Sequence, residues 1–168
     1  LLTIANSRED YMSQQKDKVI EVLENAKKII FGQHDLLESI IASLVCEAHL
    51  LIEGMPGLGK TLSVSTLSRL CDLKFQRIQF PPDLLHSDLI VTMIYNQKKE
   101  EFTTKFGPIF TQLVLADEIN RSPAKVQPDL LEAMAEKHVT IGDTSHHLDK
   151  PCVLLATMNP IAPEDTYK

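Results

Sequence analysis

A glycine-rich run at residues 54–61, Gly-Met-Pro-Gly-Leu-Gly-Lys-Thr, holds the residues of this 168-residue sequence that are best suited to chemistry. It fits the pattern G-x-x-x-x-G-K-[ST], in which glycines let the backbone turn tightly and point its N–H groups at phosphate oxygens. Lys60 provides a positive charge for the outer phosphates, and the Thr61 hydroxyl is a ligand for Mg²⁺. The run predicts a binding site for a nucleoside triphosphate; the alternative is a glycine-rich turn that only links two elements.

Two acidic residues, Asp117 and Glu118, follow the apolar run at residues 113–116. At the carboxyl end of a strand, Asp117 can hold Mg²⁺ through water, and Glu118 can orient and deprotonate an attacking water. An exposed acidic pair at a strand end is the simpler alternative. Because the pair follows the phosphate-binding pattern by about fifty residues, the catalytic interpretation is favoured.

Asn159 is the third polar residue in a position that could serve the same site. It lies in Thr-Met-Asn-Pro at residues 157–160, directly after an apolar run that is predicted to be the last strand. Since ligands bind at the carboxyl ends of parallel strands, this side chain would lie beside the γ-phosphate. The signal is weak when taken alone, because Asn-Pro is a common turn.

Apolar runs predict the elements that must position these residues. Residues 49–52 form a buried strand before the glycine-rich loop, and residues 61–71, which contain no proline or glycine, form the helix after it. The predicted strands are apolar throughout rather than alternating, so we expect an α/β fold with a parallel sheet covered by helices on both faces. Further strands are expected at 73–80, 113–116 and 153–156, and further helices at 9–30, 34–48 and 128–137.

Two β-hairpins are expected outside this sheet. Residues 91–95 and 101–104 flank a polar turn, and residues 139–141 and 146–148 are joined through a Gly-Asp turn. Both pairs of segments are short and bounded by turn-forming residues, which is typical of hairpins. The sheet and the hairpins are therefore expected to be separate structures.

Prolines decide where the helix after the acidic pair begins. Ser122 is expected as an N-cap, with Pro123 in the first turn that follows it. Pro128 removes one hydrogen bond from a helix interior, so we expect a short turn first and the main helix from about Pro128 onward.

Composition and charge indicate an ordinary globular protein. Apolar residues make up 43% and charged residues 24%, and the length suits one domain with a sizeable core. The net charge of −6 does not favour nucleic-acid binding. The cysteines, Cys46, Cys71 and Cys152, are far apart and are expected to be reduced thiols. With neither a long apolar run nor a signal-peptide pattern, we expect a cytoplasmic protein without membrane insertion.

Beyond the single motifs, the sequence resembles the MoxR family of AAA+ ATPases over about residues 29–167. The resemblance rests on a series of segments rather than on one motif, and the series is much more specific than the phosphate-binding loop alone. The segments are Phe31-Gly32-Gln33, residues 54–61, Arg77-Ile78-Gln79-Phe80, Pro82-Asp83-Leu84-Leu85, Ser87-Asp88, Phe106-Gly107-Pro108-Ile109-Phe110, Leu115 to Arg121, Leu130-Leu131-Glu132-Ala133-Met134, Ala156-Thr157, Asn159-Pro160 and Thr166-Tyr167.

The resemblance implies a P-loop NTPase of the AAA+ type with a β-hairpin insertion at residues 88–104. It implies a module that binds ATP or ADP with Mg²⁺, hydrolyses ATP and remodels or activates a client protein. Such modules usually assemble as a homo-oligomeric, hexameric ring, often with a von Willebrand A-domain partner. We expect an amphipathic helix at residues 1–30 that leads into an AAA+ core at residues 31–168.

The resemblance also assigns roles to single residues. Asn159 is implied to sense the γ-phosphate and, with Glu118 and Lys60, to take part in catalysis, while Ile30, Phe31 and Gly32 lie near the adenine. Thr61 and Asp117 are the expected metal ligands. The full expected set of nucleotide contacts is Phe31, Gly32, Gly54, Pro56, Gly57, Leu58, Gly59, Lys60, Thr61 and Leu62.

The family pattern also differs from this sequence in some places. Met158 replaces the usual Gln, and Pro128 replaces a good helix former. Family members continue past the Thr166-Tyr167 pair into a segment with an arginine finger, a fifth core strand and a helical lid domain, which are not in the sequence. We therefore expect weak ATPase activity from this chain, and an unpaired sheet edge at residues 49–52.

Several alternatives stay open at this point. Arg121 could point toward a neighbouring subunit's nucleotide, or it could be a surface arginine paired with Asp or Glu. For His146 and His147, a solvated turn is favoured over a metal site, because no third ligand has a suitable spacing. An ATPase, a nucleotide-dependent switch or scaffold without turnover, and a kinase are all compatible with the loop; Glu118 directly after Asp117 favours water activation.

Overall fold

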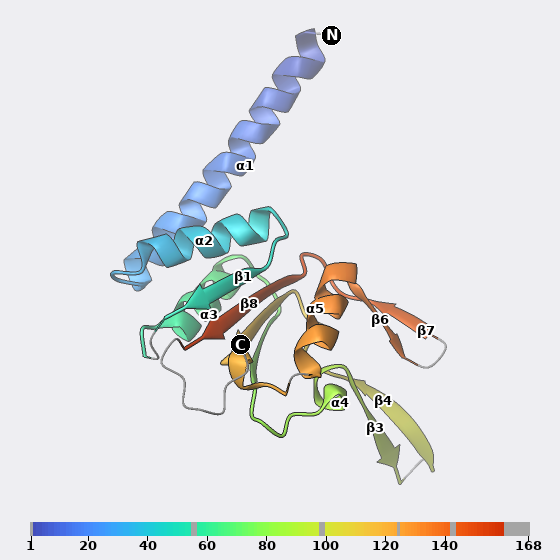
Figure 1. Cartoon of the computed structure of the whole chain (residues 1–168). Coiled ribbons are helices and arrows are strands. Elements are labelled where there is room, and N and C mark those ends of the chain that lie inside the picture. Colours follow the sequence, from blue (N-terminus) through green and yellow to red (C-terminus); the bar gives the residue numbers. More distant parts are fainter. Residues whose placement is uncertain (1, 55–56, 98–99, 124, 142–143, 160–168) are drawn as a thin grey trace.

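The computed structural model describes residues 2–54, 57–97, 100–123, 125–141 and 144–159. Figure 1 shows a central sheet with helices on both sides, a long N-terminal helix that projects from the body, and two hairpins at the opposite side. The sheet contains four parallel strands in the order β1-β8-β5-β2. These strands are β1 (Leu50–Glu53), β2 (Phe75–Gln79), β5 (Leu113–Asp117) and β8 (Val153–Met158).

The two central strands bury both of their faces, which explains why their sequences are apolar throughout. Leu113 and Leu115 of β5 pack with one set of helices, and Val114 and Ala116, which alternate with them, pack on the other side. The predicted parallel sheet with helices on both faces is therefore confirmed. The first set of helices is α1 (Leu2–Ile29), α2 (His34–Val45) and α3 (Lys60–Leu70), and the opposite face is covered by α5 (Val126–Glu136).

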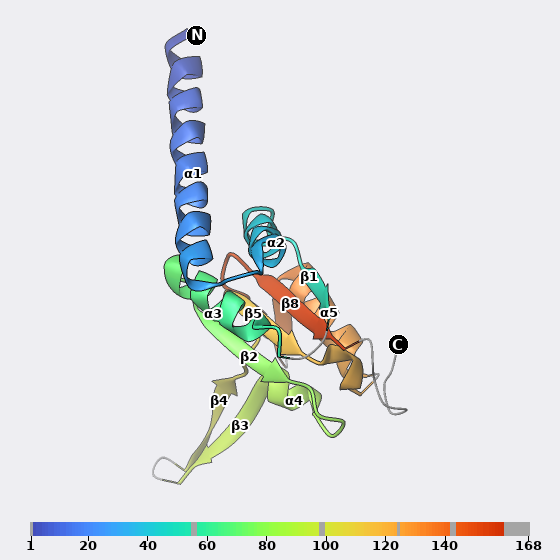
Figure 2. The same cartoon turned by 90° about the vertical axis from the view of Figure 1, so that its left-hand side faces the viewer.

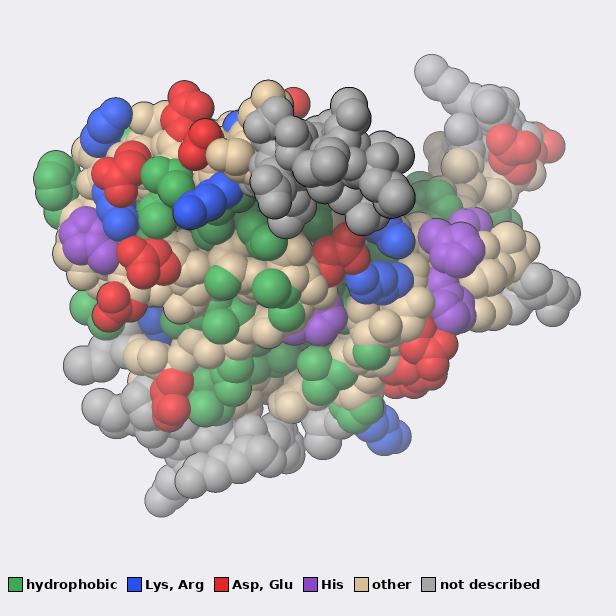
Figure 3. Space-filling model, turned by 90° about the horizontal axis from the view of Figure 1, so that it is seen from above, with side chains coloured by type: hydrophobic (Ala, Val, Ile, Leu, Met, Phe, Trp, Pro, Cys, Tyr) green, Lys and Arg blue, Asp and Glu red, His purple; other side chains and the backbone are tan. Residues whose placement is uncertain are grey.

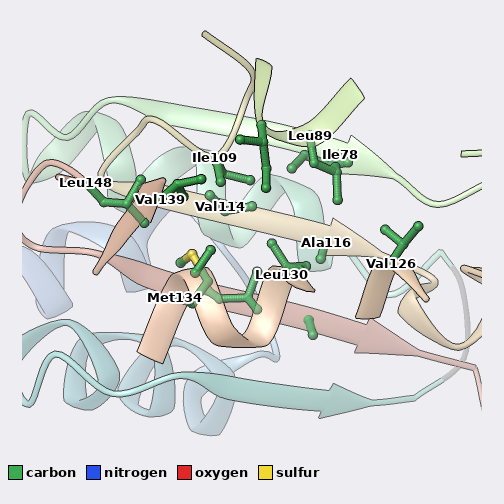
Figure 4. Packing of buried hydrophobic residues seen from close by; sticks show 14 of the residues in the cluster. Ile78, Leu89, Ile109, Val114, Ala116, Val126, Leu130, Met134, Val139 and Leu148 are labelled. Atoms are coloured by element: carbon green, nitrogen blue, oxygen red, sulfur yellow. The ribbon is translucent and has the colours of Figure 1, made fainter. Parts of the chain in front are cut away.

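Figure 4 shows the second of these interfaces in detail. Leu130 and Met134 of α5 point toward Val114 and Ala116 of β5. All four side chains have exposed fractions of at most 1%. Burial of large apolar side chains stabilises a fold by about 1.5–3 kcal/mol each, so this helix is fixed firmly under the strand that carries the acidic pair.

The first hairpin, β3 (Val91–Asn96) and β4 (Glu101–Phe106), follows the short helix α4 (His86–Leu89) and projects away from the sheet (Figure 2). Its base depends on Gly107, because a Cβ atom there would lie 2.1 Å from the Leu89 carbonyl oxygen. The Gly107 N–H donates to the Ile90 carbonyl at 2.7 Å. Backbone bonds therefore attach the foot of the hairpin directly to the core.

The second hairpin, β6 (His138–Ile141) and β7 (Thr144–His147), leans on the first one. The Phe106 ring lies 5.0 Å from the His146 ring, centroid to centroid. His146 is thus a packed side chain of a strand, and the expectation of a solvated turn is wrong for it. Among the described residues, no group of three His, Cys, Asp or Glu side chains could hold a metal ion.

The amino end of the sheet is closed by polar contacts between connecting segments. Lys137, at the end of α5, forms an ion pair with Glu47 in the turn between α2 and β1. Both residues have left-handed backbones, with φ of 57° and 48° respectively. His49 lies beside them, and its Nδ1 accepts a hydrogen bond from the Leu154 N–H at 3.1 Å. These contacts join β1, β8 and α5 at the end of the sheet that faces away from the glycine-rich loop.

Helix starts differ most from the sequence predictions. The helix expected from residue 9 begins at Leu2, and α5 begins at Val126 rather than at residue 128. Pro128 lies in the first turn of α5, where an N–H has no intrahelical acceptor, so the proline costs no hydrogen bond there. The predicted N-cap at Ser122 is wrong: its hydroxyl donates to the Ile119 carbonyl at 2.9 Å and ends the 3-10 turn η1 (Ile119–Arg121).

The surface gives a mixed picture of charge. Seen from above, acidic, basic and apolar side chains of the described residues are interspersed rather than gathered by type (Figure 3).

Ala26 and Ile30, at the end of α1 and just after it, are buried in the core, so this part of the expected N-terminal segment packs with the sheet. None of the described helices is long and apolar enough to cross a membrane.

Candidate functional site

A cavity of about 420 Å³ lies at the carboxyl ends of the strands and the amino end of α3. Polar residues from four separate segments of the chain meet there, as expected for the carboxyl edge of a parallel sheet. Its lining includes most of the predicted site. The lining residues are Gly54, Gly57, Gly59, Lys60, Thr61, Leu62, Arg77, Gln79, Asp117, Glu118, Thr157, Met158 and Asn159.

The glycine-rich loop forms one wall of the cavity. Gly54 follows β1 directly, and its N–H donates to the Met158 carbonyl at 3.1 Å. Gly57 and Gly59 have φ of +84° and +73°, in the left-handed region that glycine adopts without a steric penalty. Gly59 is the N-cap of α3, whose first-turn N–H groups lack intrahelical acceptors. The helix end therefore offers N–H donors and a positive dipole to an anion.

Lys60 is the first residue of α3, and its ammonium already has a partner in the loop. Lys60 Nζ donates to the Gly54 carbonyl at 2.6 Å. A Cβ atom at Gly54 would lie 3.5 Å from Cε and Nζ of this lysine, which is an ordinary van der Waals contact. The contact holds a positive charge at the mouth of the loop, where an outer phosphate would bind.

Asp117 ends β5 and is held by two neighbouring strands. Its side chain is only 12% exposed, and its Oδ2 lies 2.5 Å from Nε of Arg77, which comes from β2. Oδ1 accepts a hydrogen bond from the Thr157 hydroxyl of β8 at 3.1 Å. Because a buried carboxylate without partners is strongly destabilised, this pair of contacts explains how an ionised group persists here.

Glu118 follows with a strained backbone that turns the chain out of the sheet. Its φ of 57° and ψ of 47° are left-handed, which costs a non-glycine residue of order 1–3 kcal/mol. The Glu118 N–H donates to the Thr157 hydroxyl oxygen at 3.1 Å, so Thr157 binds both acidic residues. Glu118 Oε2 lies 3.3 Å from Nε of Arg121, with both side chains 40% exposed. Of the two interpretations of Arg121, the structure contains the pairing with an acidic residue.

The oxygen-rich chemistry of this cavity fits a magnesium nucleotide. The Thr61 hydroxyl and the Asp117 carboxylate are hard oxygen donors of the kind that Mg²⁺ prefers, and both residues line the cavity. Asn159 lines it from the end of β8, as predicted. These residues would hold the metal and the phosphates, while their individual roles stay predictions.

Some predicted contacts lie outside the lining of this cavity. Phe31 is 85% exposed, and neither it nor Gly32 or Leu58 is among the lining residues. Pro56 falls outside the described residues. The cavity thus corresponds to the phosphate end of the predicted site, and the adenine contacts remain a prediction.

Sequence reasoning missed three residues beside the acidic pair, of which Arg77 and Thr157 contact it. Arg77, Gln79 and Thr157 line the cavity, yet motif patterns assigned them no role. In β2, Arg77 and Gln79 alternate with the buried Ile78, which places the two polar side chains on one face. That alternation could have indicated a functional face, but the pairing of β2 with β5 places them beside Asp117, and pairing is not readable from one sequence.

Comparisons with known proteins agree with this geometry. The family model described as "ATPase family associated with various cellular activities (AAA)" matches residues 49–168. Chaperone MoxR1 of Mycobacterium tuberculosis is 47% identical over 152 residues, which cover 88% of this chain and 40% of that protein. Uncharacterized protein YeaC of Bacillus subtilis is 42% identical over 147 residues, with 88% and 46% covered.

A solved structure provides the same answer for the fold. A crystal structure from Cytophaga hutchinsonii, described provisionally as that of an ATPase, is 51% identical with a TM-score of 0.89. The match covers 98% of this chain and 50% of that one, so the chain spans half or less of the length of each relative. The resemblance found in the sequence is thereby confirmed. The chain belongs to the AAA family of ATPases and, within it, is of the MoxR type.

Proposed function

We propose that this chain is the ATP-binding and ATP-hydrolysing module of a machine that remodels or activates a client protein. One observation carries the proposal: Asp117 and Glu118, at the end of β5, share a cavity with Lys60 and Thr61 of the glycine-rich loop. A phosphate-binding loop alone fits any nucleotide-binding protein. An acidic pair beside it adds the metal ligand and the water-activating base that hydrolysis requires.

In this proposal each residue has one task. Loop N–H groups and Lys60 bind the phosphates, and Thr61 and Asp117 hold Mg²⁺, which neutralises phosphate charge when bound. Glu118 orients the attacking water and accepts its proton, and Asn159 contacts the γ-phosphate. Phe31 and Gly32 lie near the adenine, and the loop contacts extend over Pro56, Leu58 and Leu62.

Assembly and partners belong to the same proposal. We propose a homo-oligomeric ring, hexameric in the full-length protein, with a client protein, for which a von Willebrand A-domain protein is the candidate, and a cytoplasmic location. Residues 1–30 form the amphipathic segment that leads into the core at residues 31–168. Support comes from the projecting hairpin, which offers Phe102, 65% exposed, and from β1, which pairs on one side only among the described strands.

A second candidate is a nucleotide-dependent switch or scaffold without significant turnover. The ion pair between Glu118 and Arg121 favours it, because a carboxylate engaged by a guanidinium is not free to orient an attacking water. If this pair persists in the nucleotide-bound protein, binding would occur with little hydrolysis.

Steady-state formation of ADP and of free phosphate, measured with and without small-molecule acceptors, separates these functions. An ATPase forms ADP and phosphate from ATP with no acceptor present, whereas a kinase forms ADP only when it can transfer the phosphoryl group to the acceptor. ATP binding in calorimetry without ADP formation in either condition would favour the switch. Failure to bind ATP at all would overturn the proposal.

A further inference from the structure

Arg77 contacts the predicted metal ligand Asp117 from the neighbouring strand β2, and no motif assigns it a role. We propose that Arg77 is a positioning residue that occupies the Asp117 carboxylate as an internal counter-cation, which a divalent metal ion must displace. The inference rests on the proposed function, because it concerns the same metal ligand. It assigns the ion pair a role in setting how strongly Mg²⁺ contributes to nucleotide binding.

The geometry places the two cations on one carboxylate. Arg77 Nε lies 2.5 Å from Asp117 Oδ2, and the Thr157 hydroxyl binds the other oxygen, Oδ1. Both oxygens of the carboxylate are therefore engaged by the protein itself. Arg77 and Asp117 line the same cavity as Thr61, so a metal ion held by Asp117 and Thr61 would have to share the Asp117 carboxylate with the guanidinium.

The two partners differ in how easily they can leave the pair. The Asp117 side chain is 12% exposed and fixed by Thr157, whereas the Arg77 side chain is 47% exposed. Arg77 also projects from β2, which pairs only with β5 among the described strands. A half-exposed guanidinium loses little by returning to water, while a buried carboxylate without a cation is costly. Arg77 is therefore the partner that moves.

Two other cations near the acidic pair, Lys60 and Arg121, do not compete in this way. Lys60 is bound to the Gly54 carbonyl, and Arg121 contacts Glu118. Loss of Arg77 thus frees Asp117 specifically, and the freed carboxylate gains more from Mg²⁺ than a paired one does. Arg77 and Mg²⁺ compete for the same carboxylate, and such coupling acts equally in both directions. Removal of the arginine must therefore strengthen the binding of the metal ion.

The test compares ATP affinity in EDTA and in excess Mg²⁺, by calorimetry, for the full chain and for Arg77→Gln. The dissociation constant of ATP in EDTA, divided by that in excess Mg²⁺, measures how much the metal ion contributes to ATP binding. We expect this ratio to rise about tenfold in the variant, the size of one charge-assisted contact. Arg121→Gln is the matched control, because it removes the arginine that pairs with the neighbouring Glu118 but leaves Asp117 paired; its ratio should change less than twofold.

A second measurement needs no nucleotide. Adding millimolar Mg²⁺ alone should raise the thermal midpoint of Arg77→Gln by about 2–4 °C and leave the wild-type midpoint almost unchanged. The effect should vanish in Arg77→Gln combined with Asp117→Asn, and Arg77→Lys, which keeps the charge, should behave like wild type.

The outcomes are distinct from a failure of the proposed function. If the protein does not bind ATP but Arg77→Gln shows the midpoint shift, the proposed nucleotide site is wrong. The competition between Arg77 and the metal ion for Asp117 is then still supported. Equal ratios and equal midpoints in wild type and Arg77→Gln would overturn the inference. So would weaker ATP binding in EDTA with an unchanged ratio, because Arg77 would then contact phosphate rather than compete with the metal.

Discussion

The two ends of the central sheet carry ion pairs of similar chemistry in different settings. At the amino end, Glu47 and Lys137 join the turn after α2 to the end of α5, and both have left-handed backbones fixed by the local connections. At the carboxyl end, Arg77 and Asp117 join two strands and line a cavity of about 420 Å³. Similar groups thus close one end of the sheet and leave the other open to a ligand.

This difference separates contacts that serve the fold from contacts that serve binding. A pair between two connecting segments has only its own partner, so its loss should lower stability and little else. A pair that faces a cavity has an alternative partner whenever a charged ligand enters. The following substitutions test whether function and stability divide between the two ends in this way.

The largest expected effect is that of Glu118→Gln, at the open end. An amide cannot accept the proton of the attacking water, so phosphate release should slow by roughly a hundredfold or more. ATP affinity, measured by calorimetry on the same sample, should stay within about twofold, since the residue has no predicted phosphate contact. An equal loss of ATP binding and turnover would indicate a structural role for Glu118. It would also weaken the contrast between the two ends of the sheet.

Lys60→Ala is expected to come next. It removes the cation at the mouth of the loop, and a charge-assisted contact of about 1.5–3 kcal/mol corresponds to roughly ten- to a hundredfold in ATP affinity. The thermal midpoint without nucleotide should change little, because among the described residues the Lys60 ammonium has one hydrogen bond, to the Gly54 carbonyl. Unchanged ATP affinity would contradict the phosphate-binding role of the loop.

At the closed end, His49 should make stability depend on pH. Burial lowers the pKa of His49 below its usual value of 6.5, and the Leu154 N–H donates to its neutral Nδ1. Its contribution is therefore complete above pH 6.5 and is lost as the pH falls from there through the lowered pKa. His49→Asn should flatten the drop in thermal midpoint between pH 7 and 5. An identical pH profile for the variant would remove His49 as the cause.

The smallest effect is expected for Lys137→Met, which breaks the ion pair at the closed end. The pair is exposed enough that its loss should lower the thermal midpoint by only about 1–3 °C at pH 7. The hydrogen bond from Lys137 lowers the pKa of Glu47, so this difference should shrink as the pH falls below about 4.5 through the lowered pKa. ATP affinity should not change. A loss of ATP affinity would show that the two ends of the sheet are energetically coupled, which contradicts the comparison.

The sequence predicted the open end better than the closed one. Residues 54–61 and the acidic pair follow fixed spacings imposed by phosphate and metal chemistry, so they can be recognised without a structure. Glu47 and His49 lie close together, but Lys137 is 90 residues from Glu47, and the three residues follow no such spacing. Their proximity depends on how β1, β8 and α5 pack, which a single sequence does not reveal.

Within the open end, the limit of prediction is again strand pairing. Asp117 was predicted from its place after an apolar run, whereas Arg77 needed the register of β2 against β5. Ser122 illustrates the opposite case, because a local capping signal was present but the chain used that hydroxyl to end η1 instead. Local signals compete, and tertiary packing decides among them.

Gly107 gives the projecting hairpin the properties of a lever. Backbone hydrogen bonds from Gly107 to Ile90 and from Ile109 to Leu89 leave little freedom at its foot, and no side chain larger than hydrogen fits there. Strands of six residues at about 3.3 Å per residue give an arm of about 20 Å, so a tilt of about 10° at the foot moves the far end by about 3 Å. Small rotations of the core are therefore magnified at Asn96 and Glu101, the ends of β3 and β4 that lie farthest from Gly107.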